Sequence, residues 1–258
     1  MTLARMAILA ALVLSTCGAA QATSVTFTGS QGTLDAWATF GTSGSNLVVT
    51  LANISSTDCL IPADLLGSVF FDVAGSPTLT RGSAVLPLGS EIYQKGAPKT
   101  PLDRVVGGNW AYTEGIGGAP NSAHYGISST GLDIFGPHDV FPGEDLGGDT
   151  GNPPDGMSYS LLSAGDKLST GNKPLLKWTF IKSSVVFTLG GLPSDFDPST
   201  GISNVYFQYG TDLCEPGFPG EPPDEPPPPP PIPEPVTMAS VLCGLAMVGG
   251  YVRRRLVA

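Results

Sequence analysis

The chain has 258 residues, a net charge of −10, and many glycines and prolines, 34 and 25 respectively. Such an acidic surface repels phosphate backbones, which proteins bind through Lys and Arg, so nucleic acid is excluded as a partner. The length allows one large domain or two small ones, once targeting segments at the ends are set aside.

The first 22 residues predict a secretory signal peptide. Arg5 precedes an apolar stretch at residues 6–14, and Ala20 and Ala22 match an A-x-A cleavage site. The apolar stretch is too short to span a bilayer. Cys17 permits a second interpretation, a lipid-modified cysteine as in bacterial lipoproteins, although Thr16 fits poorly before it. In either case the sequence predicts an exported protein.

Residues 23–214 predict an all-β body, a single β-sandwich (jelly-roll-like) domain with long loops. Short segments rich in β-branched and aromatic residues alternate with turn residues. Leu47, Val49 and Leu51, for example, fall on one face of a strand. One helical turn is expected at "PADLL", and no internal repeat indicates a propeller. The expected strands are residues 24–29, 36–42, 46–53, 68–75, 175–181, 183–191 and 202–210.

The region from 107 to 170 is dominated by Gly, Pro, Asn, Asp and Ser, and it predicts loops with short strands near 110–112 and 132–135. Four aromatic side chains punctuate it. Such rings can stack on a sugar or anchor a long loop to the core, and the sequence leaves both open. The four are Trp110, Tyr112, Tyr125 and Phe135.

The same region contains eight carboxylates and no Lys or Arg between Arg104 and Lys167. Ca²⁺ prefers six to eight oxygen ligands, which a flexible Gly-rich loop can supply. The alternative is a solvated acidic loop without a metal, and the spacing does not match the EF-hand pattern. The candidate Ca²⁺ ligands are Asp145, Asp149, Asn152 and Asp155.

Catalytic patterns are weak. His124 and His138 do not have the spacing of a zinc motif. "GISST" around Ser128 lacks the last glycine of a nucleophile elbow. The expectation is therefore a protein that is not an enzyme, with a secreted hydrolase as a remote alternative.

Two cysteines, Cys59 and Cys214, remain in the exported body, since Cys17 and Cys243 lie in the terminal segments. An even pair in a secreted chain suggests a disulfide, and two unpaired thiols are the alternative. The part between the terminal segments has eight basic and twenty-two acidic residues, a net charge of −14.

Composition changes after Cys214. Residues 215–235 form an acidic, proline-rich segment, with twelve prolines between 216 and 235, and predict an extended polyproline II spacer. Residues 236–258 follow, with a seventeen-residue run at 236–252 that carries no charge. This run predicts a transmembrane helix, and the cluster of Arg253, Arg254 and Arg255 predicts its cytoplasmic stop.

The motif Pro233-Glu234-Pro235, the apolar run and the arginine cluster together resemble the PEP-CTERM sorting signal of Gram-negative bacteria, which an exosortase processes. The resemblance covers residues 232–255. Val236 departs from it, because such tails often have a small hydroxyl residue there. More loosely, the body resembles exosortase-dependent surface proteins of unknown activity, through stretches such as "LLGSVFFDVAG" and "YGISSTGLDIFG".

The resemblance implies export, transient anchoring in the inner membrane, processing by an exosortase-type protease near the Pro-Glu-Pro motif, and delivery to the cell surface or extracellular matrix. The leading hypothesis is thus a non-enzymatic surface or matrix protein. The alternative is a Ca²⁺- or carbohydrate-binding adhesion module in the exopolysaccharide of a biofilm.

Overall fold

The computed structural model describes residues 23–222, except residues 95, 96, 99, 102, 147–151, 155, 168–170, 172 and 174. Several predicted features therefore lie outside the described residues: the signal peptide with Ala20 and Ala22, the Pro233-Glu234-Pro235 motif, and the membrane helix with Arg253, Arg254 and Arg255. No helix in the described part of the chain is both long and apolar enough to cross a bilayer.

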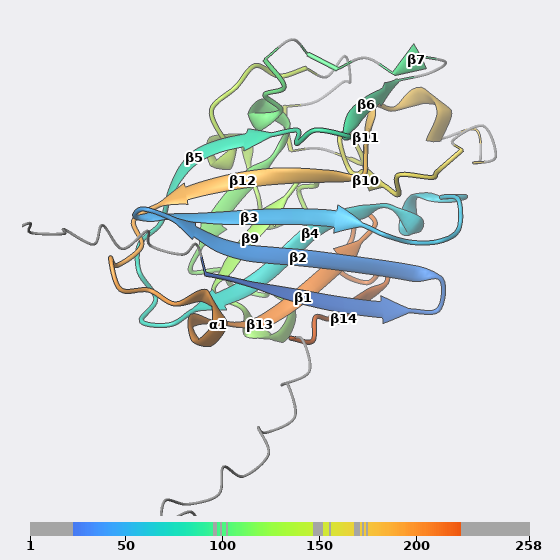
Figure 1. Ribbon diagram of the computed structural model, residues 1–258. Helices are drawn as coiled ribbons and strands as arrows, with labels where there is room; N and C mark the ends of the chain where they lie inside the picture. Colours follow the sequence, from blue (N-terminus) through green and yellow to red (C-terminus); the bar gives the residue numbers. More distant parts are fainter. Residues whose placement is uncertain are drawn as a thin grey trace, which may run out of the picture. The chain divides into compact units, whose positions relative to one another are not determined.

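The predicted all-β class is confirmed, because two sheets make up the described domain (Figure 1). The first sheet has five strands, and every neighbouring pair in it is antiparallel. Its order is β1 (Ser24–Gln31), β2 (Leu34–Ser43), β3 (Asn46–Asn53), β12 (Ser184–Gly190) and β5 (Thr80–Val85).

The second sheet has nine strands. Its main path is β14 (Gly217–Pro219), β13 (Ile202–Tyr209), β4 (Leu66–Val73), β10 (Leu161–Leu162), β11 (Phe180–Lys182), β6 (Glu91–Gln94) and β7 (Ala97–Pro98). Off this path, β9 (Tyr125–Ser128) pairs with β4 and with β8 (Ala111–Glu114).

Helical segments are short. The 3-10 turns are η1 (Pro62–Asp64), η2 (Gly107–Asn109), η3 (Pro120–Ser122), η4 (Pro137–Asp139) and η6 (Leu175–Lys177), and α1 spans Pro198–Gly201. The turn η1 confirms the helical turn predicted at "PADLL".

The core follows from period-two patterning. In β3 the predicted face of Leu47, Val49 and Leu51 is fully buried, and these side chains belong to the main hydrophobic cluster. The central strand β4 is buried on both faces instead. Phe71 belongs to the main cluster, while Phe70 packs in a separate cluster with residues of the 111–135 region, so this region covers the outer face of β4.

Two strand predictions were wrong. The expected strand at 175–181 begins as the 3-10 turn η6, and β11 starts only at Phe180. The expected strand at 132–135 is a turn in which the amides of Ile134 and Phe135 both donate to the carbonyl of Gly131. Leu132 has a φ of 50°. Leu132 and Phe135 are buried against the body although they lie in a turn, so apolar residues in this segment do not indicate a strand.

The folded domain continues past the predicted boundary at Cys214. Residues 217–219 form β14, which pairs with β13, and Phe218 is buried against Phe207 and Tyr209 at ring-centroid distances of 6.0 and 5.5 Å. An edge strand tolerates proline, because one side of it has no ladder to complete. The proline-rich segment predicted from residue 215 therefore begins inside the domain.

The predicted disulfide is absent from this structure, because Cys59 and Cys214 are free thiols. Cys59 is buried, and its Sγ donates to the carbonyl of Asp64 at 3.2 Å. Cys214 is exposed on the loop after β13. The two side chains thus occupy different environments, one inside a hydrophobic cluster and one in solvent.

Candidate functional site

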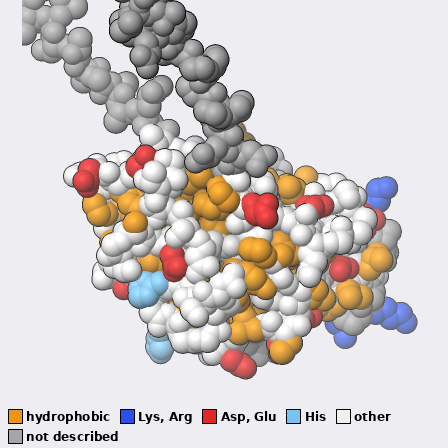
Figure 2. All heavy atoms as spheres, turned by 90° about the horizontal axis from the view of Figure 1, so that it is seen from below, with side chains coloured by type: hydrophobic (Ala, Val, Ile, Leu, Met, Phe, Trp, Pro, Cys, Tyr) orange, Lys and Arg blue, Asp and Glu red, His pale blue; other side chains and the backbone are white. Residues whose placement is uncertain are grey.

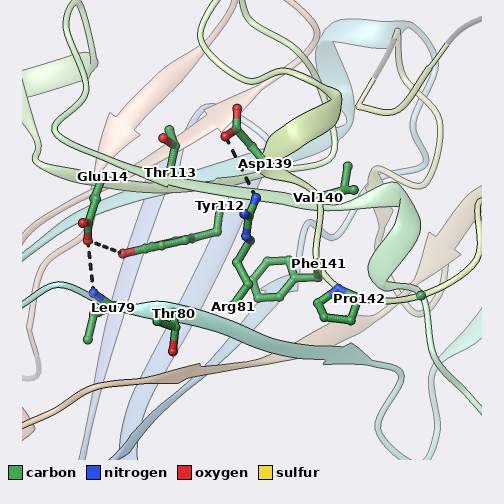
Figure 3. A pocket seen from close by; sticks show the side chains of 11 residues that line it. Leu79, Thr80, Arg81, Tyr112, Thr113, Glu114, Asp139, Val140, Phe141 and Pro142 are labelled. Atoms are coloured by element: carbon green, nitrogen blue, oxygen red, sulfur yellow. Dashed lines mark hydrogen bonds and ion pairs between the residues drawn. The ribbon is translucent and has the colours of Figure 1, made fainter.

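A polar groove lies where an edge of each sheet meets the segment that follows η4, and we call it the β5–β8 groove (Figure 3). Its volume of about 690 Å³ is within the range usual for ligand sites. The groove is lined by Leu79, Thr80, Arg81, Tyr112, Thr113, Glu114, Asp139, Val140, Phe141, Pro142 and Gly143.

Backbone contacts shape two of its walls. The amide of Phe141 donates to the carbonyl of Trp110 at 2.8 Å, which holds the segment after η4 alongside β8. On the other wall, Gly82 is an extra residue in β5, since Arg81 pairs with Leu189 while Ser83 pairs with Thr188. A Cβ on Gly82 would lie 2.8 Å from the carbonyl oxygen of Thr188, so this β-bulge requires glycine.

Arg81 supplies the positive charge of the groove. Its Nη1 donates to the carbonyl of His138 and lies 4.0 Å from Oδ1 of Asp139. Asp139 is held in place because its Oδ2 accepts a 2.8 Å hydrogen bond from the amide of Gly136. Both side chains are about one third exposed, 33% and 31%, so solvent screens their attraction. Within the described chain, no contact uses Nε or Nη2 of Arg81.

Glu114 supplies a second carboxylate on β8. Its Oε2 accepts hydrogen bonds from the amide of Leu79 at 3.1 Å and from the hydroxyl of Tyr112 at 3.2 Å. Figure 3 shows the Tyr112 hydroxyl directed at this carboxylate. Burial, with the nearby Glu114 charge, raises the pKa of Tyr112 well above its ordinary value, so the hydroxyl stays protonated and donates. Among the described contacts, Oε1 of Glu114 has no partner, and a carboxylate oxygen can only accept a hydrogen bond.

Of the two roles open to the four aromatic residues, the structure shows the second, because they anchor the loops to the body. Trp110 and Tyr125 are fully buried, Tyr112 is 4% exposed and Phe135 is 7% exposed. Tyr112 stacks on Tyr125 with an interplanar angle of 16°, and Trp110 packs against Phe187. Burial followed by the Glu114 charge raises the pKa of Tyr125 to about 12. No ring face of these four residues is available to a ligand.

The predicted Ca²⁺ ligands are only partly visible, because Asp149 and Asp155 lie outside the described residues. Asp145 accepts a 2.9 Å hydrogen bond from Nδ2 of Asn109, and Oδ1 of Asn109 accepts from the amide of Leu146. This pair fastens the loop to η2. Asn152 is exposed. Among the described side chains, no three His, Cys, Asp or Glu residues are arranged to hold a metal.

In the described structure, Ser128 of "GISST" makes no hydrogen bond to His124, so the two do not form a nucleophile–base pair. Ser128 is fully buried, and its Oγ contacts Ser68 Oγ at 2.6 Å and the carbonyl of Thr130 at 2.7 Å. The ring of His124 packs edge-on against Tyr125 instead. Ser128 is therefore part of a buried hydroxyl cluster between neighbouring strands.

Sequence reasoning missed the groove. Glu114 and Asp139 are two of the eight carboxylates of the acidic region, and Arg81 lies on β5, a strand that the sequence does not predict. No spacing pattern links these three residues. Contacts between the two sheets bring them together, since the Leu79 amide donates to Glu114 and Arg81 donates to the carbonyl of His138.

Comparison of the chain with models of protein families, with curated proteins and with solved structures finds no match. The fold and the groove therefore define the class, an all-β domain of two sheets with a polar groove at their edges.

Proposed function

We propose that the chain is an exported, non-enzymatic protein of the cell surface or extracellular matrix, delivered through its C-terminal segment by an exosortase-type protease. The observation that carries this proposal is the order of its parts. An apolar leader precedes a compact β domain, and a proline-rich segment, the Pro233-Glu234-Pro235 motif, an apolar run and three arginines follow it.

The described structure supports the proposal in two respects. The compact unit ends at Pro223, so the β domain ends ten residues before the Pro-Glu-Pro motif begins at Pro233. On the face seen in Figure 2, carboxylates are scattered while Lys and Arg side chains appear at one margin. Such a surface suits a secreted, soluble domain and disfavours nucleic acid as a partner. The proposal also includes three features predicted from the sequence: a jelly-roll connectivity of the β domain, an extended proline-rich spacer, and a C-terminal membrane helix.

Replacement of Pro233-Glu234-Pro235 by three alanines tests the sorting step. We expect the full chain, expressed in a Gram-negative host that has an exosortase, to reach the surface with its C-terminal segment removed. The variant should remain in the inner membrane with that segment intact. The measurement is cell fractionation with intact-mass determination.

The matched control replaces Pro226, Pro227 and Pro228 by alanine, which alters the same segment but leaves the motif untouched. This control should be processed normally. Retention of the C-terminal segment in the wild-type chain, or removal of it in the motif variant, would contradict the proposal. Recovery of the wild-type chain from the cytoplasm with residues 1–22 still attached would contradict the export step.

A further inference from the structure

We propose that the β5–β8 groove binds a neutral oligosaccharide segment through the hydroxyl groups of its sugars. This inference goes beyond the proposed function, because export and sorting require no ligand. It places the binding site at side chains on β5, β8 and η4, and of the four aromatic residues considered in the sequence only Tyr112 lines it.

The charges of the groove select an uncharged ligand. The lining of the groove includes one guanidinium, that of Arg81, and two carboxylates, those of Asp139 and Glu114. A ligand with a net negative charge would be repelled by both carboxylates, and a cationic ligand would compete with Arg81, whose Nη1 already lies 4.0 Å from Oδ1 of Asp139. Juxtaposed like charges are a common means of rejecting wrong partners. An uncharged ligand avoids both penalties.

The hydrogen-bonding groups of the groove select hydroxyls. Nε and Nη2 of Arg81 can only donate, while Oε1 of Glu114 can only accept, and Thr113 adds a hydroxyl that can do both. Each hydroxyl of a ligand can donate and accept at once, so neighbouring hydroxyls on a sugar ring can satisfy a donor and an acceptor together. Hydrogen bonds that involve a charged partner are the stronger kind, which suits a site without an aromatic platform.

An added peptide strand is disfavoured by the geometry of β5. Strand addition needs a regular edge with continuous backbone pairing. The bulge at Gly82 breaks the register of β5 where it lines the groove, and such bulges protect sheet edges from further pairing. Apolar ligands are disfavoured as well, since Leu79 is 4% exposed and Phe141 is 1% exposed.

Saturation-transfer NMR on the full chain tests the proposal. The protein is purified in lauryldimethylamine oxide, a detergent without a sugar headgroup. The neutral probes are maltotriose, cellotriose, mannotriose and galactotriose at millimolar concentration, and trigalacturonate and trilysine are the charged probes. We expect transfer to at least one neutral trisaccharide and to neither charged probe.

Three single substitutions locate the site, namely Arg81→Met, Glu114→Gln and Thr113→Val. Loss of a charge-assisted hydrogen bond should weaken binding about tenfold or more for the first two. The matched controls Lys182→Met and Glu91→Gln lie outside the groove lining and should bind as the wild-type chain does. Melting temperatures identify any variant that has lost its fold, and Thr113→Val keeps the test decisive in that case.

Three results would overturn the proposal. The first is the absence of transfer to every neutral trisaccharide. The second is stronger transfer to trigalacturonate or to trilysine, which would identify an anion or a cation site. The third is binding that all three groove variants leave unchanged. None of these results bears on the sorting experiment, so the two proposals fail independently.

Discussion

Thr28 and Glu221 exchange two backbone hydrogen bonds, 2.9 and 2.7 Å long, between the first strand of one sheet and the second residue beyond β14 of the other. The segment 217–221 therefore contacts both sheets, pairing with β13 through β14 and with β1 through Glu221. It closes one side of the domain at the point where the chain enters its proline-rich segment.

Gly29 permits this closure, and its substitution by alanine should destabilise the domain. A Cβ at residue 29 would lie 2.6 Å from the carbonyl oxygen of Pro219 and 2.8 Å from the ring of Phe218. Overpacking of this kind costs about 1–3 kcal/mol of unfolding free energy. Urea denaturation of the Gly29→Ala variant measures the loss.

Gly41→Ala is the matched control on the neighbouring strand. A Cβ at residue 41 would make only ordinary contacts, the nearest at 3.5 Å to Cβ of Ser24. We expect this variant to be neutral or slightly stabilised, because alanine restricts the unfolded chain. Equal stabilities of the two variants would show that the contact of residues 217–221 with β1 contributes little to the unfolding free energy.

Trp110 should prove to be a structural residue. It is fully buried against Phe187, so Trp110→Ala should cost about 3–5 kcal/mol of unfolding free energy. Its buried Nε1 has no hydrogen-bond partner among the described residues. Trp110→Phe removes this unsatisfied donor together with part of the ring, so it should cost clearly less than the alanine variant. Denaturant titration that finds both variants as stable as the wild-type chain would contradict the buried position.

Asp166 should make the stability of the domain depend on pH. It is 2% exposed, its Oδ2 accepts a 2.6 Å hydrogen bond from the amide of Cys59, and its Oδ1 has no partner within the described structure. Burial raises the pKa of Asp166 above its ordinary value of 3.8. The folded state therefore binds the proton more tightly than the unfolded state does.

The sign of the effect follows from this difference. The contribution of Asp166 is most favourable below the pKa of the unfolded chain and is lost as the pH rises through the raised pKa of the folded state. Asp166→Asn mimics the neutral acid, so it should be more stable than the wild-type chain at pH 7 and lose that advantage at acidic pH. Melting curves at several pH values measure this.

Asp197→Asn serves as the control for the charge change, because Asp197 is an exposed N-cap of α1 whose role an amide can fill. Its stability should follow that of the wild-type chain at every pH. If the difference in stability between the wild-type chain and Asp166→Asn does not vary with pH, Asp166 is not a buried ionisable carboxyl.

The two thiols of the domain should differ in reactivity. Cys214 is exposed, whereas Cys59 is 1% exposed, and burial together with Asp166 raises the pKa of its thiol. In the native protein an alkylating reagent should modify Cys214 and leave Cys59 unmodified until the chain is unfolded. Peptide mapping by mass spectrometry distinguishes the two. A peptide that links Cys59 to Cys214 under non-reducing conditions would restore the disulfide predicted from the sequence.

The sequence predicts a strand well where the alternation of apolar and polar residues lies within the strand itself, and poorly where burial depends on a distant partner. The strands β1, β2, β3, β12 and β13 follow from alternation within the segment itself, and they were predicted close to their observed bounds. By contrast, β9 consists of "YGIS" inside a Gly-rich region that predicted loops. All four of its residues are buried, because β9 pairs with the central strand β4. That partner lies more than fifty residues away, so no local pattern announces it.

The aromatic residues illustrate the same limit. Composition indicated that Trp110, Tyr112, Tyr125 and Phe135 would either stack on a ligand or anchor a loop, and only the packing of the 107–142 region on β4 and β12 decided for the second. Likewise, only the tertiary structure shows that the side chain of Asp145 accepts a hydrogen bond from Asn109 and so ties its loop to η2.

The sequence by itself determined the all-β class and the period-two faces of its regular strands, because these depend on neighbours along the chain. It also predicts the export and sorting segments at both ends. Only the tertiary structure decided that residues 217–221 belong to the domain, that the two cysteines are unpaired, and that Arg81, Glu114 and Asp139 share a groove. These features depend on which strand edges meet, and strand pairing between distant segments is set by the packing of the whole core.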